Sequence, residues 1–319
     1  MENEIKFDEN LLDLLPKEFE ELKKLKLKNL KNFKIEEISV VGSFILRTVT
    51  QPNNNVDVTL KIPTDFISKK STTTTKGKGK ELENYILDEE NYFLKRAYFL
   101  CGIVKVLKKY EMFSDIEFES FRGDYLKPII SIKPKKDLKL DSESKFISTK
   151  FKIKILPTID ENKFKNLKKE TILEDCFFKN HLILIHEKMK DCPSLVETSI
   201  LFKVWLKKRK IYDTFDSFNG FLISILIIFL LNQKIITKNM SSFQMLRNIL
   251  NWISNDDSFL NSLNFNSSSS SSSSTNNNSN NDKDEDSKII LNDLNNFNLF
   301  FRISKQSLKE VRRNIFKFF

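Results

Sequence analysis

Two short segments hold the residue types and spacing that could do chemistry on a nucleotide. The run Val41-Gly-Ser-Phe44 predicts a strand that ends in a tight turn, whose backbone amides and Ser43 hydroxyl could hold phosphate groups. Further along, Asn55-Val-Asp57 opens a β-branched run that alternates with a period of two, which predicts a second strand. Residues two apart on a strand share a face, so two acids at these positions could hold metal ions between them.

The predicted metal site lacks two of its acids. The first position of the pair is Asn55, which is neutral, so only Asp57 remains. A third acid should come from one of the later strands predicted at 128–132 and 151–156, but neither run contains Asp or Glu. The second run instead carries lysines, Lys152 and Lys154, which would place positive charge where a metal needs negative charge.

Two other acids leave an alternative open. Glu117 and Glu119 lie on a further predicted strand, 116–121, and could compensate for the missing acids. An active site that uses Asp57 with Glu117 or Glu119 is therefore the alternative. The main expectation is a degenerate pocket formed by Gly42, Ser43, Asn55 and Asp57, with no catalytic and no metal-binding residue.

Composition sets the class of protein. The 319 residues are 40% hydrophobic and carry 53 Lys and Arg against 43 Asp and Glu, a net charge of +10. This is enough chain for one large or two medium domains, and it excludes collagen-like, disulfide-scaffold and wholly disordered proteins. The three Cys and two His show no metal-ligand spacing, so no cofactor is expected. The longest apolar stretch, 218–231, is too short for a bilayer and predicts a buried helix, with no membrane partner.

The apolar pattern predicts an α+β chain in three parts. These are an N-terminal helical extension at 1–36, a mixed sheet with flanking helices at 37–165, and a mainly helical domain at 166–319. A Ser-, Asn- and acid-rich insert at 264–287 predicts disorder, as does a polar loop at 68–80. Helices are predicted at 9–33, 44–50, 84–110, 174–190, 194–210, 217–232, 241–253 and 305–318, and a first strand at 38–41.

Lysines gather in two places. Between 127 and 169 they outnumber the acids, and Lys207-Lys-Arg-Lys210 adds a cluster at a predicted helix end. Such stretches neutralise phosphates and give sequence-independent, salt-sensitive RNA affinity. A solvated surface, or cations that complement a helix dipole, is an equally good explanation of each cluster. The expected RNA-binding residues are Lys127, Lys133, Lys135, Lys136, Lys152, Lys154, Lys207, Lys208 and Arg209.

Several motifs resemble known families. The Gly-Ser turn and the Asp57 strand resemble nucleotidyltransferases of the polymerase-β type, which implies a nucleotidyltransferase-like fold for 37–165. On this resemblance the alternative function is an active, template-independent RNA nucleotidyltransferase that uses Asp57 with Glu117 or Glu119. The later Lys203-Val-Trp205, basic run and Gly220-Phe resemble the substrate-binding domain of poly(A) polymerases and oligoadenylate synthetases. The chain is more similar still to the Nrap family, also called nucleolar RNA-associated protein, from about residue 37 to 319. The segments that carry this resemblance are Val40-Val-Gly-Ser-Phe-Ile-Leu-Arg-Thr48, Asn55-Val-Asp-Val-Thr-Leu-Lys-Ile-Pro63, Tyr92-Phe-Leu-Lys-Arg-Ala97, Leu126-Lys-Pro128 and Met240-Ser-Ser-Phe-Gln-Met-Leu-Arg247.

The resemblance implies a pseudoenzyme. Nrap proteins are tandem nucleotidyltransferase-like modules without catalytic acids, and the Asn-Val-Asp that replaces the usual acid pair stands here at 55–57. They act in the small-subunit processome of the nucleolus, inside the nucleus, during ribosomal RNA processing. The partners implied are precursor ribosomal RNA and other processome proteins, with no DNA. Family members are longer and carry a second module, so this chain is expected to be the first module alone.

Overall fold

The computed structural model describes most of the chain, in segments. These are 37–50, 54–69, 86–135, 151–160, 163–164, 167, 169–212, 215–255, 263–264, 291–293 and 297–317. Three sequence predictions fall outside them: the helix at 9–33, most of the polar loop at 68–80, and the Ser- and Asn-rich insert from residue 265 onward. The chain divides into two compact units, Met1–Ile45 with Gln51–Leu182, and Leu46–Thr50 with Ile183–Phe319.

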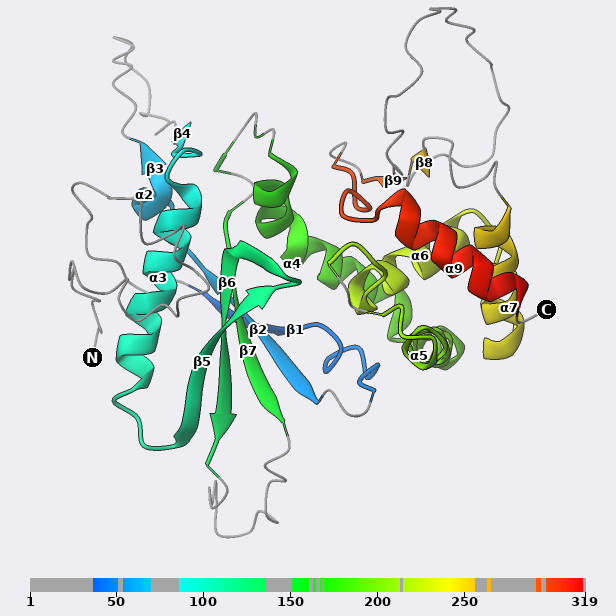
Figure 1. Cartoon of the computed structure of the whole chain (residues 1–319), viewed down its shortest axis with the longest axis horizontal. Helices are drawn as coiled ribbons and strands as arrows, with labels where there is room; N and C mark the ends of the chain where they lie inside the picture. The colour runs from blue at the N-terminus through cyan, green and yellow to red at the C-terminus, as the bar shows by residue number, and fades with distance from the viewer. Residues whose placement is uncertain are drawn as a thin grey trace, which may run out of the picture. The chain divides into compact units, whose positions relative to one another are not determined.

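The first unit is built on a five-stranded mixed sheet (Figure 1). Its strands are β1 (Ile38–Val41), β2 (Asn55–Lys61), β5 (Phe113–Phe121), β6 (Asp124–Pro134) and β7 (Lys152–Thr158), in the order β1-β2-β7-β6-β5. Only β2 and β7 pair in parallel, and all other neighbours are antiparallel. Each strand overlaps one predicted from the alternating pattern, so the predicted mixed sheet is confirmed.

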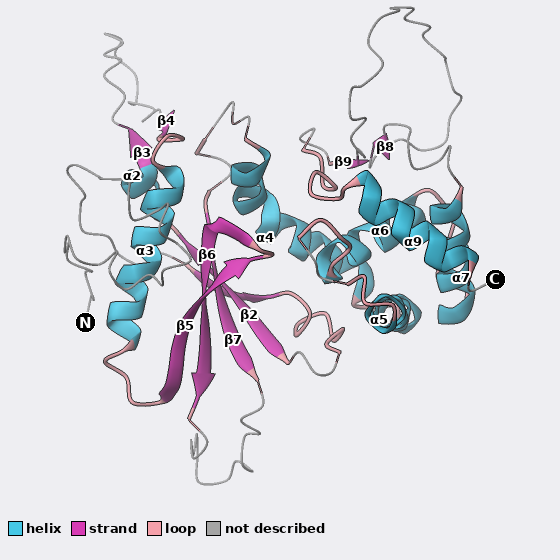
Figure 2. Ribbon diagram, in the orientation of Figure 1, coloured by secondary structure: helices cyan, strands magenta, loops and turns pink. Residues whose placement is uncertain are grey.

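Helix α3 (Tyr92–Leu107) covers one face of this sheet (Figure 2). Its buried residues Ala97, Leu100 and Val104 repeat at helical intervals and share a core with Leu60 of β2 and Ile130 of β6. Burying side chains of this size contributes about 1.5–3 kcal/mol each. Asn55 and Asp57 alternate with the core-facing residues of β2 and so lie on the opposite face of the sheet.

Helix α3 begins later than the sequence predicted. Ile86–Leu87 forms the short strand β4, which pairs with β3 (Ser68–Lys69), just after the single-turn helix α2 (Thr64–Ile67). A turn then follows in which the Asn91 side chain donates to the Asp88 carboxylate. This local hydrogen bond competes with helix formation, so the helix starts only at Tyr92.

The segment after β1 is a series of turns and not the predicted helix at 44–50. Gly42 has a φ of 76° and Arg47 a φ of 55°. Both values lie in the left-handed region, which a right-handed helix cannot contain. The prediction of a helix here was therefore wrong.

The second unit is mainly helical, as predicted. It contains the last part of α4 (Glu170–Met189), then α5 (Pro193–Lys208), α6 (Gly220–Asn232), α7 (Ser242–Ser254) and α9 (Lys305–Phe316), with a two-residue parallel pair of β8 (Leu263–Asn264) and β9 (Leu291–Asn292). Helix α6 is buried over nearly its whole length, and the Asn219 side chain caps it by accepting from two backbone amides. None of the helices in the described segments is long and apolar enough to span a membrane.

The division between the units lies inside α4, between Leu182 and Ile183, later than the predicted boundary at 165/166. The first half of α4 belongs with the sheet because Glu174 and Asp175 bond to side chains of α3 and β6. Residues 46–50 belong with the helices for a similar reason. The buried Lys203 of α5 donates to both the carbonyl and the hydroxyl of Thr48, at 2.9 Å each.

Candidate functional site

The turn after β1 brings Gly42 against Asp57, as the sequence predicted. Val41 pairs with Asp57 across β1 and β2, which places the carboxylate beside the turn. A Cβ atom added to Gly42 would lie 2.5 Å from Asp57 Oδ2, closer than real contacts allow. Glycine is therefore required here both by its left-handed φ of 76° and by the approach of the carboxylate. Ser43, next in the turn, is half-buried.

A lysine stands directly beside Asp57. In the parallel pairing of β2 with β7, Asp57 lies opposite Lys154 and Asn55 lies opposite Lys152. Residues opposite each other on neighbouring strands share a face of the sheet. The row continues through Ser131 of β6, which pairs with Lys154. The face of the sheet that carries Asp57 thus has lysines of β7 between that acid and the acids of β5, where a metal site needs carboxylates close together.

Glu119 of β5 binds both of these lysines. Its carboxylate lies 3.0 Å from Lys152 Nζ and 2.9 Å from Lys154 Nζ, and its side chain is 28% exposed. Partial burial alone raises the pKa of Glu119, but hydrogen bonds from the two ammonium groups outweigh it and lower the pKa to about 2. Glu119 is therefore ionised at neutral pH and engaged by lysines.

The remaining acids of β5 face another lysine. Lys133 Nζ lies 3.2 Å from Asp115 and 3.7 Å from Glu117, and all three side chains are substantially exposed. Within the described segments no three His, Cys, Asp or Glu residues group closely enough to hold a metal ion. Asp57 with a lysine on the neighbouring strand does not fit a divalent cation, which needs several oxygen ligands.

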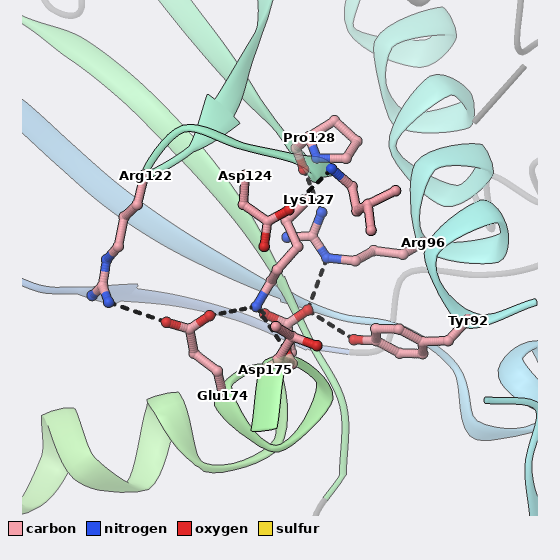
Figure 3. A network of polar contacts seen from close by, with 10 residues as sticks. Tyr92, Arg96, Arg122, Asp124, Lys127, Pro128, Glu174 and Asp175 are labelled. Carbon is pink, nitrogen blue, oxygen red and sulfur yellow. Dashed lines mark hydrogen bonds and ion pairs between the residues drawn. The ribbon is translucent and has the colours of Figure 1, made fainter. Parts of the chain in front are cut away.

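Lys127 is a structural lysine, and its predicted role in RNA binding was wrong. Its side chain is fully buried, and its ammonium lies 2.7 Å from Glu174, 2.8 Å from Asp175 and 2.9 Å from the Thr171 carbonyl (Figure 3). A lysine has three N–H donors, so these acceptors use all of them. No donor and no surface remain for a phosphate.

The same network contains Tyr92 and Arg96, two residues of the Tyr92-Phe-Leu-Lys-Arg-Ala97 segment. Tyr92 and Arg96 of α3 both donate to Asp175 Oδ2, and Arg96 also donates to the carbonyl of Pro128 (Figure 3). Burial, followed by the charge of Asp175, raises the pKa of Tyr92. The Tyr-Phe-Leu-Lys-Arg-Ala and Leu-Lys-Pro segments therefore meet on the acids of α4 and fix the fold. Their sequence alone gave no signal of this pairing, because the acids lie far along the chain.

The cluster at the end of α5 is only partly available. Lys207 Nζ donates to Thr50 Oγ1 at 2.8 Å and lies over the ring of Tyr212. Arg209 stacks on Trp205, with 4.2 Å from its Cζ atom to the ring centroid. Trp205 is 6% exposed and therefore belongs to the core of the helical unit. Lys208 is exposed.

Among the other expected RNA contacts, Lys135 is exposed and Lys136 lies outside the described residues.

Comparison with known proteins gives consistent matches. A family model described as Nrap protein domain 1 matches residues 87–172, and one described as Nrap protein PAP/OAS-like domain matches 194–315. "Nucleolar protein 6" of Xenopus laevis is 30% identical over 248 residues, and the human protein of that name 26% over 254. "U3 small nucleolar RNA-associated protein 22" of Saccharomyces cerevisiae is 26% identical over 269 residues. These matches cover 70–71% of this chain, which spans about a fifth of each relative.

The solved structures that resemble this chain in backbone fold share little sequence identity with it. The apo form of mtPAP is 13% identical with a TM-score of 0.49, over 88% of this chain and 58% of that one. Cid1 bound to its short product ApU is 12% identical with a TM-score of 0.46, over 98% and 88%. The two family models cover the sheet unit and the helical unit in sequence order. From these two matched domains, the chain belongs to the Nrap family.

Proposed function

We propose that this chain is a catalytically inactive nucleotidyltransferase-like module that binds precursor ribosomal RNA and proteins of the small-subunit processome. It acts in the nucleolus, within the nucleus, during ribosomal RNA processing. The names of its relatives support this proposal, since one refers to the nucleolus and another to association with the U3 small nucleolar RNA. The chain spans about a fifth of the length of those relatives, so the proposal concerns this module and not the whole of a longer protein.

The pairing of Asp57 with Lys154 carries the proposal of inactivity. A two-metal mechanism places divalent cations between carboxylates to stabilise the attacking and leaving oxygens. The residue opposite Asp57 on β7 is Lys154, whose ammonium lies 2.9 Å from Glu119 of β5, so this face of the sheet carries positive charge that disfavours a divalent cation. The other acid of the pair is replaced by Asn55, which has no charge.

The alternative enzyme, using Asp57 with Glu117 or Glu119, finds no support in the site. Glu119 is engaged by Lys152 and Lys154, and releasing it to a metal would leave both ammonium groups without their acceptor. Glu117 lies on β5, separated from β2 by β6 and β7, and faces Lys133.

Lys127 is buried and cannot contact RNA, so the proposal of RNA binding rests on the other expected cations, which are exposed or partly exposed where the structure describes them. Lys135 and Lys208 are exposed, and Lys133, Lys152 and Lys154 are partly exposed beside acids of β5. Such cations contribute sequence-independent affinity that falls with salt. The acids beside three of them reduce that contribution, so Lys135, with its neighbour Lys136, should carry more of it.

A filter-binding titration at several salt concentrations tests the proposal. We expect the affinity for single-stranded RNA to fall steeply with salt, with a slope of about −0.7 per phosphate neutralised. Replacing Lys133, Lys135 and Lys136 by alanine should weaken binding and make that slope shallower. Lys188→Ala removes an exposed lysine of the helical unit and is the matched control. Absence of RNA binding by the unaltered chain would reject RNA as a partner.

A further inference from the structure

Helix α7 carries an exposed aromatic side chain in an otherwise well-ordered amphipathic pattern. Its inward residues, among them Met245, Ile249 and Ile253, are completely buried. Phe243, the second residue of the helix, is 71% exposed, more than any other large apolar side chain described. Leaving a phenylalanine in water forfeits about 1.5–3 kcal/mol that burial would contribute. Packing of α7 within its own unit does not account for this residue.

The neighbours of Phe243 on the outer face of α7 are all polar. Arg247 and Asn251 follow at intervals of four residues, so the three side chains form one row along the helix, and Gln244 flanks it. All are exposed. The loop before the helix adds two exposed cations, Lys234 and Lys238.

This loop is held firmly against α7. Asn248 of the helix donates to the carbonyl of Ile235, next to Lys234, and the Gln244 side chain accepts from the backbone N–H of Ser241 in a capping box. Ile236 is fully buried and anchors the loop from below. The exposed cations therefore start from a backbone that is already ordered, which reduces the entropic cost of binding.

The charged residues of α7 and of the loop before it are all cations. No Asp or Glu occurs between residues 217 and 255, a stretch that contains Lys234, Lys238 and Arg247. In the segments that the structure describes, none of these three cations forms an ion pair. The nearby α5 does expose an acid, Glu197, one residue before Thr198, whose hydroxyl donates to the Ser242 carbonyl. Positive charge beside an exposed ring and amide side chains complements single-stranded nucleic acid.

We propose that the outer face of α7 and its preceding loop bind a single-stranded segment of RNA. Phe243 stacks on an unpaired base, Arg247, Lys234 and Lys238 contact phosphates, and Gln244 and Asn251 offer hydrogen bonds to base edges. A single strand fits better than a duplex because stacking on a side chain needs a base that is free of its own stack. This inference rests on the proposed RNA-binding function and gives it a site that the lysines at 127–169 do not include.

Fluorescence anisotropy with a labelled single-stranded RNA and the full chain tests the site. Phe243→Ala should weaken binding roughly 5- to 100-fold with an unchanged salt slope, because stacking is not ionic. Arg247→Ala should instead make the salt slope shallower by about 0.7. Phe243→Tyr should retain affinity. Phe316→Ala, which removes a 70% exposed phenylalanine from α9, is the matched control and should bind normally.

The results separate this site from the general proposal. Equal thermal stability of Phe243→Ala and the unaltered chain is expected, since the ring is exposed. If the unaltered chain binds RNA and Phe243→Ala binds equally well, the site on α7 is wrong and the RNA-binding function stands. If Phe243→Ala keeps its RNA affinity but no longer binds an acidic protein that the unaltered chain binds, the surface is a protein-binding site instead. If the unaltered chain binds no RNA, both proposals fall.

Discussion

Lys154 lies directly opposite Asp57 in the parallel pairing of β7 with β2, and its ammonium is 2.9 Å from Glu119. Lys154 therefore occupies the strand position next to the remaining acid of the pocket, and its ammonium engages a possible substitute acid on β5. Lys152 repeats the arrangement opposite Asn55. Lysine side chains on this face balance the charge of the acid on β5, whereas a metal site would leave the carboxylates free to bind cations.

Stability in acid should depend on Glu119. Because its folded pKa of about 2 lies below the unfolded value of 4.5, its contribution is complete above pH 4.5 and is lost as the pH falls toward 2. The shift corresponds to at most about 3 kcal/mol, and less after solvent screening of a partly exposed pair. Urea unfolding at pH 6 and pH 3 should therefore show a smaller acid loss for Glu119→Gln than for the unaltered chain. Glu310 is an exposed acid on α9, so Glu310→Gln should lose as much stability between pH 6 and pH 3 as the unaltered chain.

The contact between Gly42 and Asp57 can be measured by a double-mutant cycle. Gly42→Ala forces a left-handed φ on alanine and drives its Cβ into the carboxylate, so it should cost about 2–3 kcal/mol of unfolding free energy. In an Asp57→Ala background the collision disappears, and the cost should fall to about 1–2 kcal/mol, the backbone component alone. Equal costs in both backgrounds would mean that the two residues do not touch.

Lys127 should matter for folding and not for RNA. Lys127→Met leaves the buried carboxylates of Glu174 and Asp175 without one of their cations, and should destabilise the chain by about 3 kcal/mol. The folded fraction should bind RNA as before. Lys135→Met, at an exposed lysine, should change stability by less than about 0.5 kcal/mol. A large loss of RNA affinity in stable, folded Lys127→Met would contradict this role.

Two substitutions should create a metal site. Asn55→Asp with Lys154→Asp would place three carboxylates on one face, at Asp57, beside it on β2 and opposite it on β7. We expect this double variant to bind Mn²⁺ with a Kd on the order of 10⁻³ M, seen as loss of the free-ion signal in electron paramagnetic resonance. Neither single variant should bind, because each keeps either the neutral residue or the lysine. Mn²⁺ binding by Asn55→Asp alone would show that Lys154 is not the obstacle.

The sequence could place Asn55 and Asp57 on one face because their relationship is local. Asn55 and Asp57 are two residues apart, and the alternating pattern of β2 places them on one face wherever the strand packs. The fate of Lys127 could not be predicted, because its partners Glu174 and Asp175 come from a helix far along the chain. A lysine in a basic stretch and a lysine at the centre of a buried network look alike in sequence.

The turn after β1 was mispredicted for a different reason. Apolar residues at 44–46 suit a helix, but Gly42 and Arg47 adopt left-handed backbone conformations on either side of them. Backbone conformation at an arginine leaves no mark on the hydrophobic pattern. The division between the units was missed for the same kind of reason, since Lys203 ties residues 46–50 to α5 through hydrogen bonds to Thr48.

Primer extension is the most direct test of the central claim, that this nucleotidyltransferase fold does no chemistry. The purified chain would be incubated with labelled RNA, each nucleoside triphosphate, and Mg²⁺ or Mn²⁺, and the products resolved by length. We predict no extension with any nucleotide or metal, by either the unaltered chain or Asp57→Ala. Extension by the unaltered chain that disappears in Asp57→Ala would contradict the account and restore an active site built on that carboxylate.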